Sequence, residues 1–348
     1  MRAKASLLLL PLLALVSCDS GGGGGGGAIV TPPPTGAPAP SPAPAPTPAP
    51  VPFPTPTPTS GNFFAQAAAM FAVQPDIAAC QPGQLTSQVT TRTLQSLNAI
   101  RALHRLPAAA YSSADEPGAQ QAALMMAANA QLSHTPPTSW RCYTAAGAAA
   151  AGASNLYGGL GSGLTLLTDE QILAGWLTEI DNLTAESVGH RRWLLDPFLG
   201  SVAYGRVAGP HATYTRTDAA AMKVFDTAGP AGPTGPLPPY VAYPFEDYPA
   251  RLFDTNALLS FGVISNPTNR WGNTNVSFAN ATVTVRQRGG GTLAVSRQRW
   301  DNDGYGLPNN LQFFVSGLQP NIVYDVSING VSVGGAATNY SYWFRIVP

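Results

Sequence analysis

The stretch VGHRRWLLDP, residues 188–197, marks the point at which a helical pattern gives way to a strand pattern. Before it, three segments predict helices: the first and third carry apolar residues on one side, and the second is a run rich in Ala, Leu and Met that predicts a tightly packed helix. These segments are residues 94–103, 119–132 and 168–180. The third begins with Thr168 and Gln171 at the spacing of a capping box, which indicates a helix start there.

Strands are expected after this stretch. Residues 201–207 alternate between the two faces of a strand, and residues 220–225 return as its partner. Gly209 and Pro210 are expected to turn the chain between them. Helices followed by paired strands indicate an α/β fold over residues 80–228, an α-β-α sandwich with an antiparallel sheet.

A second domain is expected at residues 238–348. Several Gly-Pro and Pro-Pro steps in residues 227–240 indicate a linker, and beyond it short segments favour β-branched and aromatic residues. This pattern predicts a small all-β sandwich, immunoglobulin- or fibronectin-like. Asn329-Gly330 is expected to close a hairpin. The segment LQPNIVYDV, residues 318–326, resembles the tyrosine-bearing corner of fibronectin-type domains.

Residues 1–17 have the features of a secretory signal peptide. Two basic residues precede an apolar core at residues 7–16, which is too short to span a bilayer of about 30 Å. The core ends in Leu-Val-Ser-Cys, which resembles a bacterial lipobox and implies that Cys18 becomes the lipid-modified first residue. The alternative is a plain secreted protein in which Cys18 is incidental. We expect a lipid-anchored, extracytoplasmic protein of the bacterial cell envelope, in the periplasm or at the cell surface, whose lipid makes the membrane a partner.

Residues 18–60 are expected to form a disordered stalk. Gly21–Gly27 is an uninterrupted glycine run, and 14 prolines lie between Pro32 and Pro58. Glycine runs are flexible, whereas Pro-rich segments favour the extended polyproline II conformation. The segment has almost no large apolar side chains, so it cannot bury a core. It therefore predicts a spacer of roughly 80 Å between the lipid and the folded domains.

Charge and cysteine content exclude several classes of function. The 18 Lys and Arg residues balance 18 Asp and Glu residues, which argues against a nucleic-acid partner. Three cysteines are too few for a disulfide-rich scaffold or an all-thiolate zinc site. Once Cys18 is lipidated, Cys80 and Cys142 remain, and an oxidising compartment favours a disulfide between them. Two buried thiols are the alternative.

Two histidines lie in motifs that could form a site. His134 lies in LSHTPP and His190 in the stretch quoted above, with GASNLY (residues 152–157) and WLTE (residues 176–179) between them. The order of these motifs resembles the CAP superfamily, or SCP domain, which includes cysteine-rich secretory proteins, antigen 5 and plant pathogenesis-related proteins. Secreted bacterial members are the most similar, and the resemblance covers about residues 90–226.

The resemblance implies a CAP-type α-β-α sandwich with a cleft in which two His and two Glu residues face one another. His134 and His190 match the two histidines, and Glu179 matches the Glu of the second helix. The other acidic position, the Glu of the family's G-E-N motif, is Ser154 here, ahead of Asn155. The acidic set of the implied ligand or metal cleft is therefore incomplete.

The chemistry of these residues leaves alternatives open. Two neutral imidazoles can hold Zn²⁺ or another divalent cation, in a weak site that Glu179 or water would complete. A hydrogen-bonded structural pair of histidines is the alternative. Catalysis is the less favoured interpretation: Glu179 would activate a metal-bound water, or Ser154 would act as a nucleophile beside a histidine, yet no nucleophile elbow or oxyanion hole is recognisable.

Other polar residues near the motifs have simpler interpretations. His104 and His211 are expected at the surface or in turns. Arg191 and Arg192 could bind an anionic ligand, although a structural ion pair is the more ordinary role of an arginine beside a cleft Glu.

A surface-anchored binding or interaction module is the favoured function. Its partner would be an apolar small molecule, an envelope polymer or another cell surface. A metal-assisted hydrolase using His134, Glu179 and His190 is the second hypothesis. The third is a glycan- or cell-wall-binding adhesin, in which aromatic residues of the β domain stack on sugars rather than pack in the core or at strand edges: Trp271, Trp300, Tyr305 and Trp343.

Overall fold

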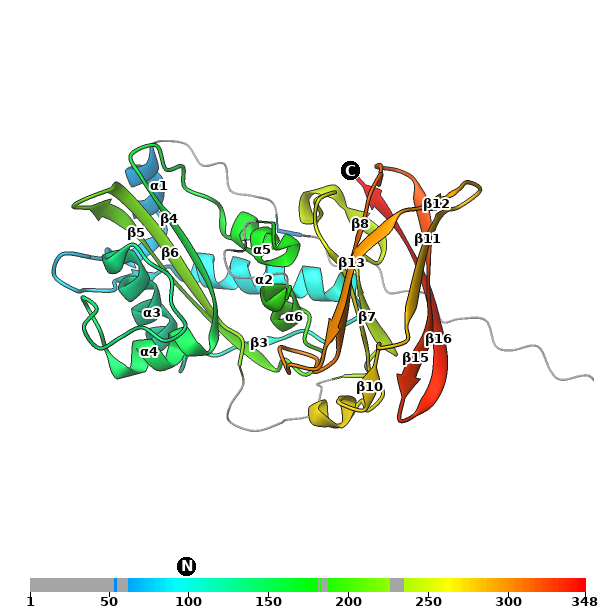
Figure 1. Cartoon of the computed structure of the whole chain (residues 1–348). Coiled ribbons are helices and arrows are strands. Elements are labelled where there is room, and N and C mark those ends of the chain that lie inside the picture. The colour runs from blue at the N-terminus through cyan, green and yellow to red at the C-terminus, as the bar shows by residue number, and fades with distance from the viewer. Residues whose placement is uncertain (1–52, 55–61, 181, 183–186, 226–234) are drawn as a thin grey trace, which may run out of the picture. The chain divides into compact units, whose positions relative to one another are not determined.

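The computed structural model describes residues 53–54, 62–180, 182, 187–225 and 235–348. The expected signal peptide, Cys18 and all but two residues of the expected stalk lie outside these ranges. The described residues lie in one compact unit, in which an α/β lobe precedes an all-β lobe (Figure 1). Within the described ranges, no helix has the length and apolar content needed to cross a bilayer.

The α/β lobe is a three-layer sandwich, as predicted. Its elements are α1 (Phe63–Ala68), β1 (Phe71–Val73), β2 (Gln84–Leu85), α2 (Ser87–Leu103), β3 (Ala110–Tyr111), α3 (Glu116–Asn129), α4 (Ala145–Gly152), β4 (Ser154–Leu160), α5 (Asp169–Thr178), α6 (Gly189–Leu194), β5 (Ser201–His211) and β6 (Thr215–Lys223). The central sheet has the order β3-β5-β6-β4 and is antiparallel except where β3 meets β5. Helices α3 and α4 pack on one face, and α2 and α5 pack on the other (Figure 1).

Each strand contributes side chains to two hydrophobic cores, because successive side chains point to opposite faces of a sheet. In β6, Ala219 and Ala221 pack with α3, whereas Ala220 and Met222 pack with α2 and α5. On the α3 side the layers lie very close together. A Cβ at Gly205 would lie 2.2 Å from a backbone nitrogen of α3, so only glycine fits there.

The sheet differs from the prediction at one turn. Gly209 and Pro210 do not turn the chain; they lie in β5 and pair with Thr217 and Arg216 of β6. Proline is tolerated there because β3 pairs only with the first residues of β5, so the far end of β5 has a free edge. The turn follows His211, whose Nδ1 accepts hydrogen bonds from two backbone N–H groups of the turn, as expected of a turn residue.

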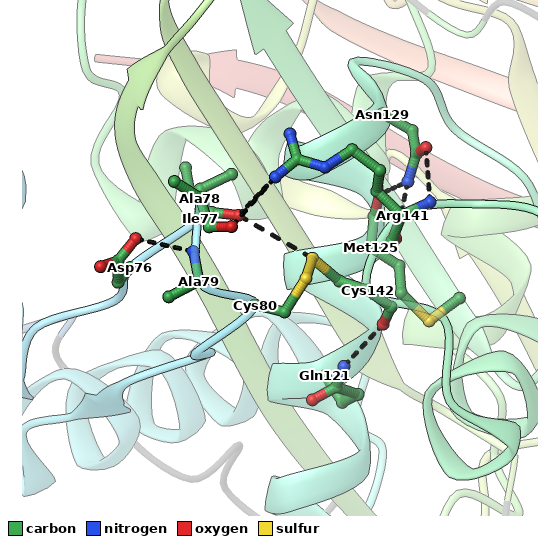
Figure 2. Close-up of a disulfide and its surroundings, with 10 residues drawn as sticks. All are labelled: Asp76, Ile77, Ala78, Ala79, Cys80, Gln121, Met125, Asn129, Arg141 and Cys142. Atoms are coloured by element: carbon green, nitrogen blue, oxygen red, sulfur yellow. Dashed lines mark hydrogen bonds between the residues drawn. A yellow bond between two sulfur atoms is a disulfide. The ribbon is translucent and has the colours of Figure 1, made fainter.

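The predicted disulfide between Cys80 and Cys142 is present. It joins the segment before β2 to the segment between α3 and α4, and neighbouring side chains support it (Figure 2). Arg141 donates to the carbonyl of Ala78 at 3.2 Å, and Gln121 donates to the carbonyl of Cys142 at 2.9 Å. The bridge spans a sequence separation of 62 residues. Closing such a loop restricts the unfolded chain by about 4 kcal/mol in the loop-entropy model.

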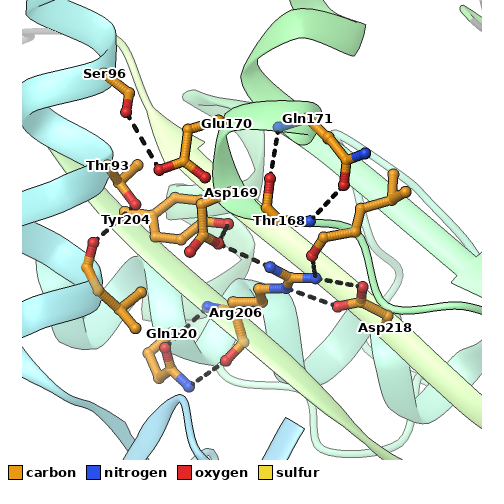
Figure 3. A network of polar contacts seen from close by, with 12 residues as sticks. Thr93, Ser96, Gln120, Thr168, Asp169, Glu170, Gln171, Tyr204, Arg206 and Asp218 are labelled. Carbon is orange, nitrogen blue, oxygen red and sulfur yellow. Dashed lines mark hydrogen bonds and ion pairs between the residues drawn. The ribbon is translucent and has the colours of Figure 1, made fainter. Parts of the chain in front are cut away.

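A buried ion network fixes the start of α5 to the sheet (Figure 3). The guanidinium of Arg206 on β5 donates to both oxygens of Asp218 at 2.9 and 2.6 Å, and to Asp169 at 2.8 Å. The hydroxyl of Tyr204 donates to Asp169 at 2.7 Å. Burial alone would lower the pKa of Arg206, but the two carboxylates raise it well above its ordinary value, so the side chain stays charged. The predicted capping box begins α5 at the same place.

The all-β lobe is a sandwich of two sheets, as predicted. Its elements are β7 (Tyr240–Tyr243), β8 (Glu246–Pro249), η1 (Ala250–Leu252), β9 (Leu259–Val263), η2 (Arg270–Asn273), β10 (Val276–Ser277), β11 (Thr282–Gln287), β12 (Thr292–Leu293), β13 (Val295–Asp301), β14 (Asn310–Val315), β15 (Val323–Val333) and β16 (Ala336–Val347). One sheet has the order β12-β11-β15-β16-β8, with β10 also on β15, and the other has the order β13-β14-β9-β7. Residues of both sheets fill the interior, among them Phe261, Phe313, Val326 and Phe344.

The tyrosine corner is present in this lobe, but the hairpin prediction is wrong. The hydroxyl of Tyr324 accepts a hydrogen bond from the backbone N–H of Gln319 at 2.8 Å, the geometry of such a corner. Asn329 and Gly330 lie inside β15, at a shift of its register with β16, so they do not form a turn. The strand runs on to a turn at Gly334-Gly335, where both residues have positive φ.

His104 is buried between the two lobes, which corrects the expectation that it lies at the surface. It is 2% exposed. Its Nδ1 lies 2.8 Å from the carbonyl oxygen of Ala242, and its Nε2 lies 3.1 Å from the hydroxyl of Tyr248. Both partners belong to the all-β lobe, which covers the end of α2. The residues around His104 in the sequence give no sign of this cover.

The environment of His104 favours a neutral ring. Burial lowers the pKa of His104 from 6.5 to about 3; the carbonyl of Ala242 opposes this shift, and the charges of Arg191 and Arg101 add to it. Between these two pKa values the unfolded chain binds a proton that the folded chain does not. The free energy of unfolding therefore falls as the pH falls through this interval.

We expect His104→Gln to remove part of the acid sensitivity of folding. In the wild type, this one group should lower the unfolding free energy by up to about 1.4 kcal/mol per pH unit below about pH 6. Chemical denaturation at several pH values measures this slope. His211→Gln is the matched control and should keep the wild-type slope. Identical slopes in the wild type and His104→Gln would contradict a buried neutral histidine.

Candidate functional site

Glu179 and His190 form the central contact of the candidate site. The Nδ1 atom of His190 lies 3.0 Å from Oε2 of Glu179. The Glu179 side chain is 4% exposed and the His190 side chain is 20% exposed. Because Nδ1 faces the carboxylate, Nε2 is the ring atom left for a ligand, and among the described residues it has no hydrogen-bond partner.

The end of α5 sets the position of Glu179. The helix ends at Thr178, and Glu179 takes a left-handed backbone conformation with φ 60° and ψ 18°. This region is strained for a residue with a side chain, so fixing contacts are needed. The carboxylate supplies two of them besides His190. It accepts from the Asn182 amide at 2.7 Å and from the backbone N–H of Arg191 at 3.0 Å.

Arg191 supports the same turn from inside the protein. Its guanidinium donates to the carbonyls of Leu177 and Thr178, at the end of α5, at 2.6 and 3.1 Å. It also donates to the carbonyl of Leu258 at 2.7 Å and to the hydroxyl of Ser260 at 3.1 Å, in the all-β lobe. The contact with Glu179 thus runs through the backbone of Arg191, whereas its side chain joins the two lobes and does not face an anionic ligand.

Both candidate histidines are attached to the junction of α4 and β4. The Nδ1 atom of His134 lies 3.0 Å from the carbonyl oxygen of Ala151. The side-chain amide of Asn155 donates to the carbonyl of His190 at 3.0 Å. Ala151 and Asn155 are four residues apart, so their backbones lie within about 14 Å of each other. His134 is the more exposed of the two, and among the described residues no hydrogen bond or ring contact joins the two imidazoles.

Ser154 lies at this junction with its hydroxyl turned to the backbone. The hydroxyl donates to the carbonyl of Ala150 at 2.7 Å, and the residue is buried. This carbonyl at the end of α4 also accepts from the backbone N–H of Ala153 at 3.0 Å, so the serine adds a second donor to the helix end. A nucleophile would instead need its hydroxyl on a histidine nitrogen. The serine therefore has a structural role in this geometry.

The hypothesis of a three-residue metal site is not supported. In the part of the chain that the structure describes, no group of three or more His, Cys, Asp or Glu side chains is placed to hold a metal ion. Glu179 already accepts three hydrogen bonds, so it is not available to complete a set with His134 and His190. Two imidazoles alone are fewer than the three protein ligands typical of catalytic zinc.

Two positioning residues were not anticipated from the sequence. Asn182 follows Glu179 by three residues. A polar side chain so close after the helix end is a local signal for a hydrogen bond to the Glu179 carboxylate. Arg191 had no such signal for its role, because its partners Leu258 and Ser260 lie about 70 residues further along the chain.

The aromatic residues considered for sugar stacking are mostly exposed. Trp271, Trp300 and Tyr305 are 60%, 41% and 44% exposed, and Trp343 is partly buried. Trp300 lies on β13, an edge strand, as the packing alternative expects. Trp271 and Tyr305 lie outside the strands, and packing in the core does not describe them.

We expect Glu179→Gln to loosen the orientation of His190. The amide retains one acceptor oxygen but sets an NH₂ group against donors that the carboxylate accepted, at a cost of about 1–3 kcal/mol in stability. The ring held by the carboxylate should then adopt more than one orientation. Long-range ¹H–¹⁵N spectra of the ring measure this change. Glu170→Gln, on the same helix, should leave the His190 signals in place. Unaltered His190 signals in Glu179→Gln would rule out the orienting role.

Part of the α/β lobe matches a known protein family. Residues 94–223 match the family model of CAP, the cysteine-rich secretory protein family. The match begins within α2 and ends with β6, so it includes all five candidate cleft residues and leaves out the all-β lobe. No curated protein matches the chain.

Proposed function

Because residues 94–223 belong to the CAP family of cysteine-rich secretory proteins, we propose that this chain is an extracytoplasmic binding protein with its ligand site at His190. The ligand is an amphipathic small molecule, whose polar group bonds to Nε2 of His190 while its apolar part lies beside the ring. Cys18 carries the lipid that anchors the protein to the bacterial envelope, and residues 18–60 are the spacer.

The observation that carries this proposal is the buried contact between Glu179 and His190. A carboxylate that is 4% exposed and accepts three hydrogen bonds is fixed before a ligand arrives. This carboxylate orients the His190 ring, which is partly exposed and leaves its Nε2 atom for a ligand. The ring of Trp176 lies 6.4 Å from that of His190, between centroids, and is buried in the core behind it. A polar group that is oriented before the ligand arrives lowers the entropic cost of binding.

Hydrolysis is less well supported by the same geometry. A general base must reach the proton that it removes, and the oxygens of Glu179 are already engaged. The Ser154 hydroxyl is bonded to a carbonyl. A metal-assisted hydrolase is the second candidate, because His134 and His190 each contact a residue of the α4–β4 segment, although the three-residue metal set is absent among the described residues.

We expect His190→Ala to weaken ligand binding by about tenfold, the loss of one good hydrogen bond of about 1.4 kcal/mol. The probe is cis-parinaric acid, which has a polar head and an apolar chain and whose fluorescence rises in an apolar site. Saturable binding by the wild type and weak binding by His190→Ala support the proposal. His211→Ala is the control and should bind as the wild type does.

Zinc titration separates the two candidate functions. Stoichiometric Zn²⁺ binding that is lost in both His134→Ala and His190→Ala would favour the metal-assisted hydrolase over the binding protein. No saturable uptake of parinaric acid, or equal uptake by the wild type and His190→Ala, would refute the proposed ligand site.

We expect Cys18→Ala to release the protein from the membrane. Stable attachment of a lipoprotein requires more than one acyl chain, and all of them depend on this cysteine. Detergent phase partition and fractionation of cells measure the change, which should move most of the protein to the soluble fraction. Ser20→Ala is the neighbouring control and should stay with the membrane. Membrane association that survives Cys18→Ala would show that the anchor lies elsewhere.

A further inference from the structure

Two exposed aromatic side chains lie on adjoining loops of the all-β lobe. Trp271 is 60% exposed and Tyr305 is 44% exposed. Their loops touch, since a Cβ at Gly304 would lie 3.0 Å from the Trp271 ring. We call Trp271 and Tyr305 the aromatic platform. Tryptophan is highly buried on average, so a tryptophan exposed to this extent needs a reason.

The loop that carries Trp271 is held rigidly. Asn273 is fully buried, and its amide donates to the carbonyls of Asn266, Asn269 and Arg270 at 2.9–3.0 Å. Its side-chain oxygen accepts from the backbone N–H of Asn266 at 2.8 Å. The Asn269 side chain accepts from the backbone N–H of Trp271 at 3.0 Å. A loop fixed in this way loses little conformational entropy when a ligand binds.

Arg270 joins this loop to the loop that carries Tyr305. Its guanidinium donates to the carbonyls of Gly306 and Gly304 at 2.8 and 3.2 Å. It lies 5.3 Å from the ring centre of Trp271 and 4.7 Å from that of Trp193, a buried residue of the α/β lobe. Arg270 therefore contacts both the exposed Trp271 and the buried Trp193.

Arg192 ties the second loop to the α/β lobe. It forms the ion pair expected for this residue, with Asp301, at 2.8 and 3.1 Å. It also donates to the carbonyl of Tyr305 at 2.9 Å. Both arginines near the platform, Arg192 and Arg270, thus have their guanidinium groups bonded to protein atoms.

Neutral polar groups and one carboxylate border the platform. Thr274, Asn302 and Asp303 are exposed. The hydroxyl of Thr274 donates to the carbonyl of Trp271, and the amide of Asn302 donates to the carbonyl of Thr274. Flat aromatic rings bordered by hydroxyl, amide and carboxylate groups match the two kinds of surface on a pyranose, whose C–H face stacks on a ring and whose hydroxyls form hydrogen bonds.

We propose that Trp271 and Tyr305 form a subsite for the pyranose rings of a glycan polymer. A membrane surface fits less well, since anionic lipid attracts free basic side chains, while Arg192 and Arg270 are bonded internally and Asp303 is exposed at the platform. A protein interface has a larger apolar core than two rings on adjoining loops. This subsite does not depend on the function proposed for His190.

The test is calorimetric titration of the full chain, made soluble by Cys18→Ala, with chitohexaose and with cellohexaose. Saturable binding of at least one hexasaccharide is expected. Trp271→Ala and Tyr305→Ala should each weaken it about tenfold or more, and Trp271→Phe should retain most of it. Because both side chains are exposed, the variants should unfold at the wild-type temperature, which confirms that they are folded.

Two controls make the result specific. Tyr214→Ala removes an aromatic ring of similar exposure, 42%, from the β5–β6 turn and should bind as the wild type does. His190→Ala should also bind normally, which separates this subsite from the proposed ligand site. Binding of neither hexasaccharide by the wild type, or equal binding by the wild type and Trp271→Ala, would overturn the proposal. So would Trp271-dependent binding to anionic lipid vesicles in place of the sugars.

Discussion

The hydrogen bonds of the Arg191 guanidinium hold both the candidate site and the contact between the two lobes. It is fully buried, bonds to carbonyls at the end of α5 and in the all-β lobe, and lies 3.9 Å from the ring centre of Tyr243. Burial lowers the pKa of Arg191, whereas Tyr243 and Glu179 oppose this shift. A buried charge that loses its partners costs about 3–5 kcal/mol, a large share of the stability of a domain. The α/β lobe therefore needs the all-β lobe in order to hold the Glu179 turn.

The sequence predicted those parts of the fold that depend on local patterns. The capping box, the helix-to-strand order and the β-rich second half follow from spacing over a few residues, and the three-layer architecture follows from their order. The two wrong turns have one physical cause. Gly209-Pro210 and Asn329-Gly330 are turn formers when considered alone, but β6 and β16 pair with the strands that contain them. Pairing with a partner strand outweighs the local preference of two residues.

The residues of the candidate site also fall into those that the sequence identified and those that it did not. His190 and Glu179 were identified because their motifs keep a recognisable order, and the structure brings them into contact. The role of His104 was not predictable, because a histidine beside an arginine at a helix end looks like a surface residue. Its burial comes from Ala242 and Tyr248, which lie about 140 residues later in the chain. Composition and periodicity do not show that residues so far along the chain will bury a side chain.

The close approach at Gly205 bears on how this domain can vary. Side chains usually set the distance between a helix and a sheet, so substitutions in them shift the layers slightly. Where α3 meets β5, the backbones themselves are in contact, and no exchange of side chains can adjust the gap. Sequences that keep this fold should thus keep glycine at this position, and the fixed spacing becomes a geometric reference for the rest of the lobe.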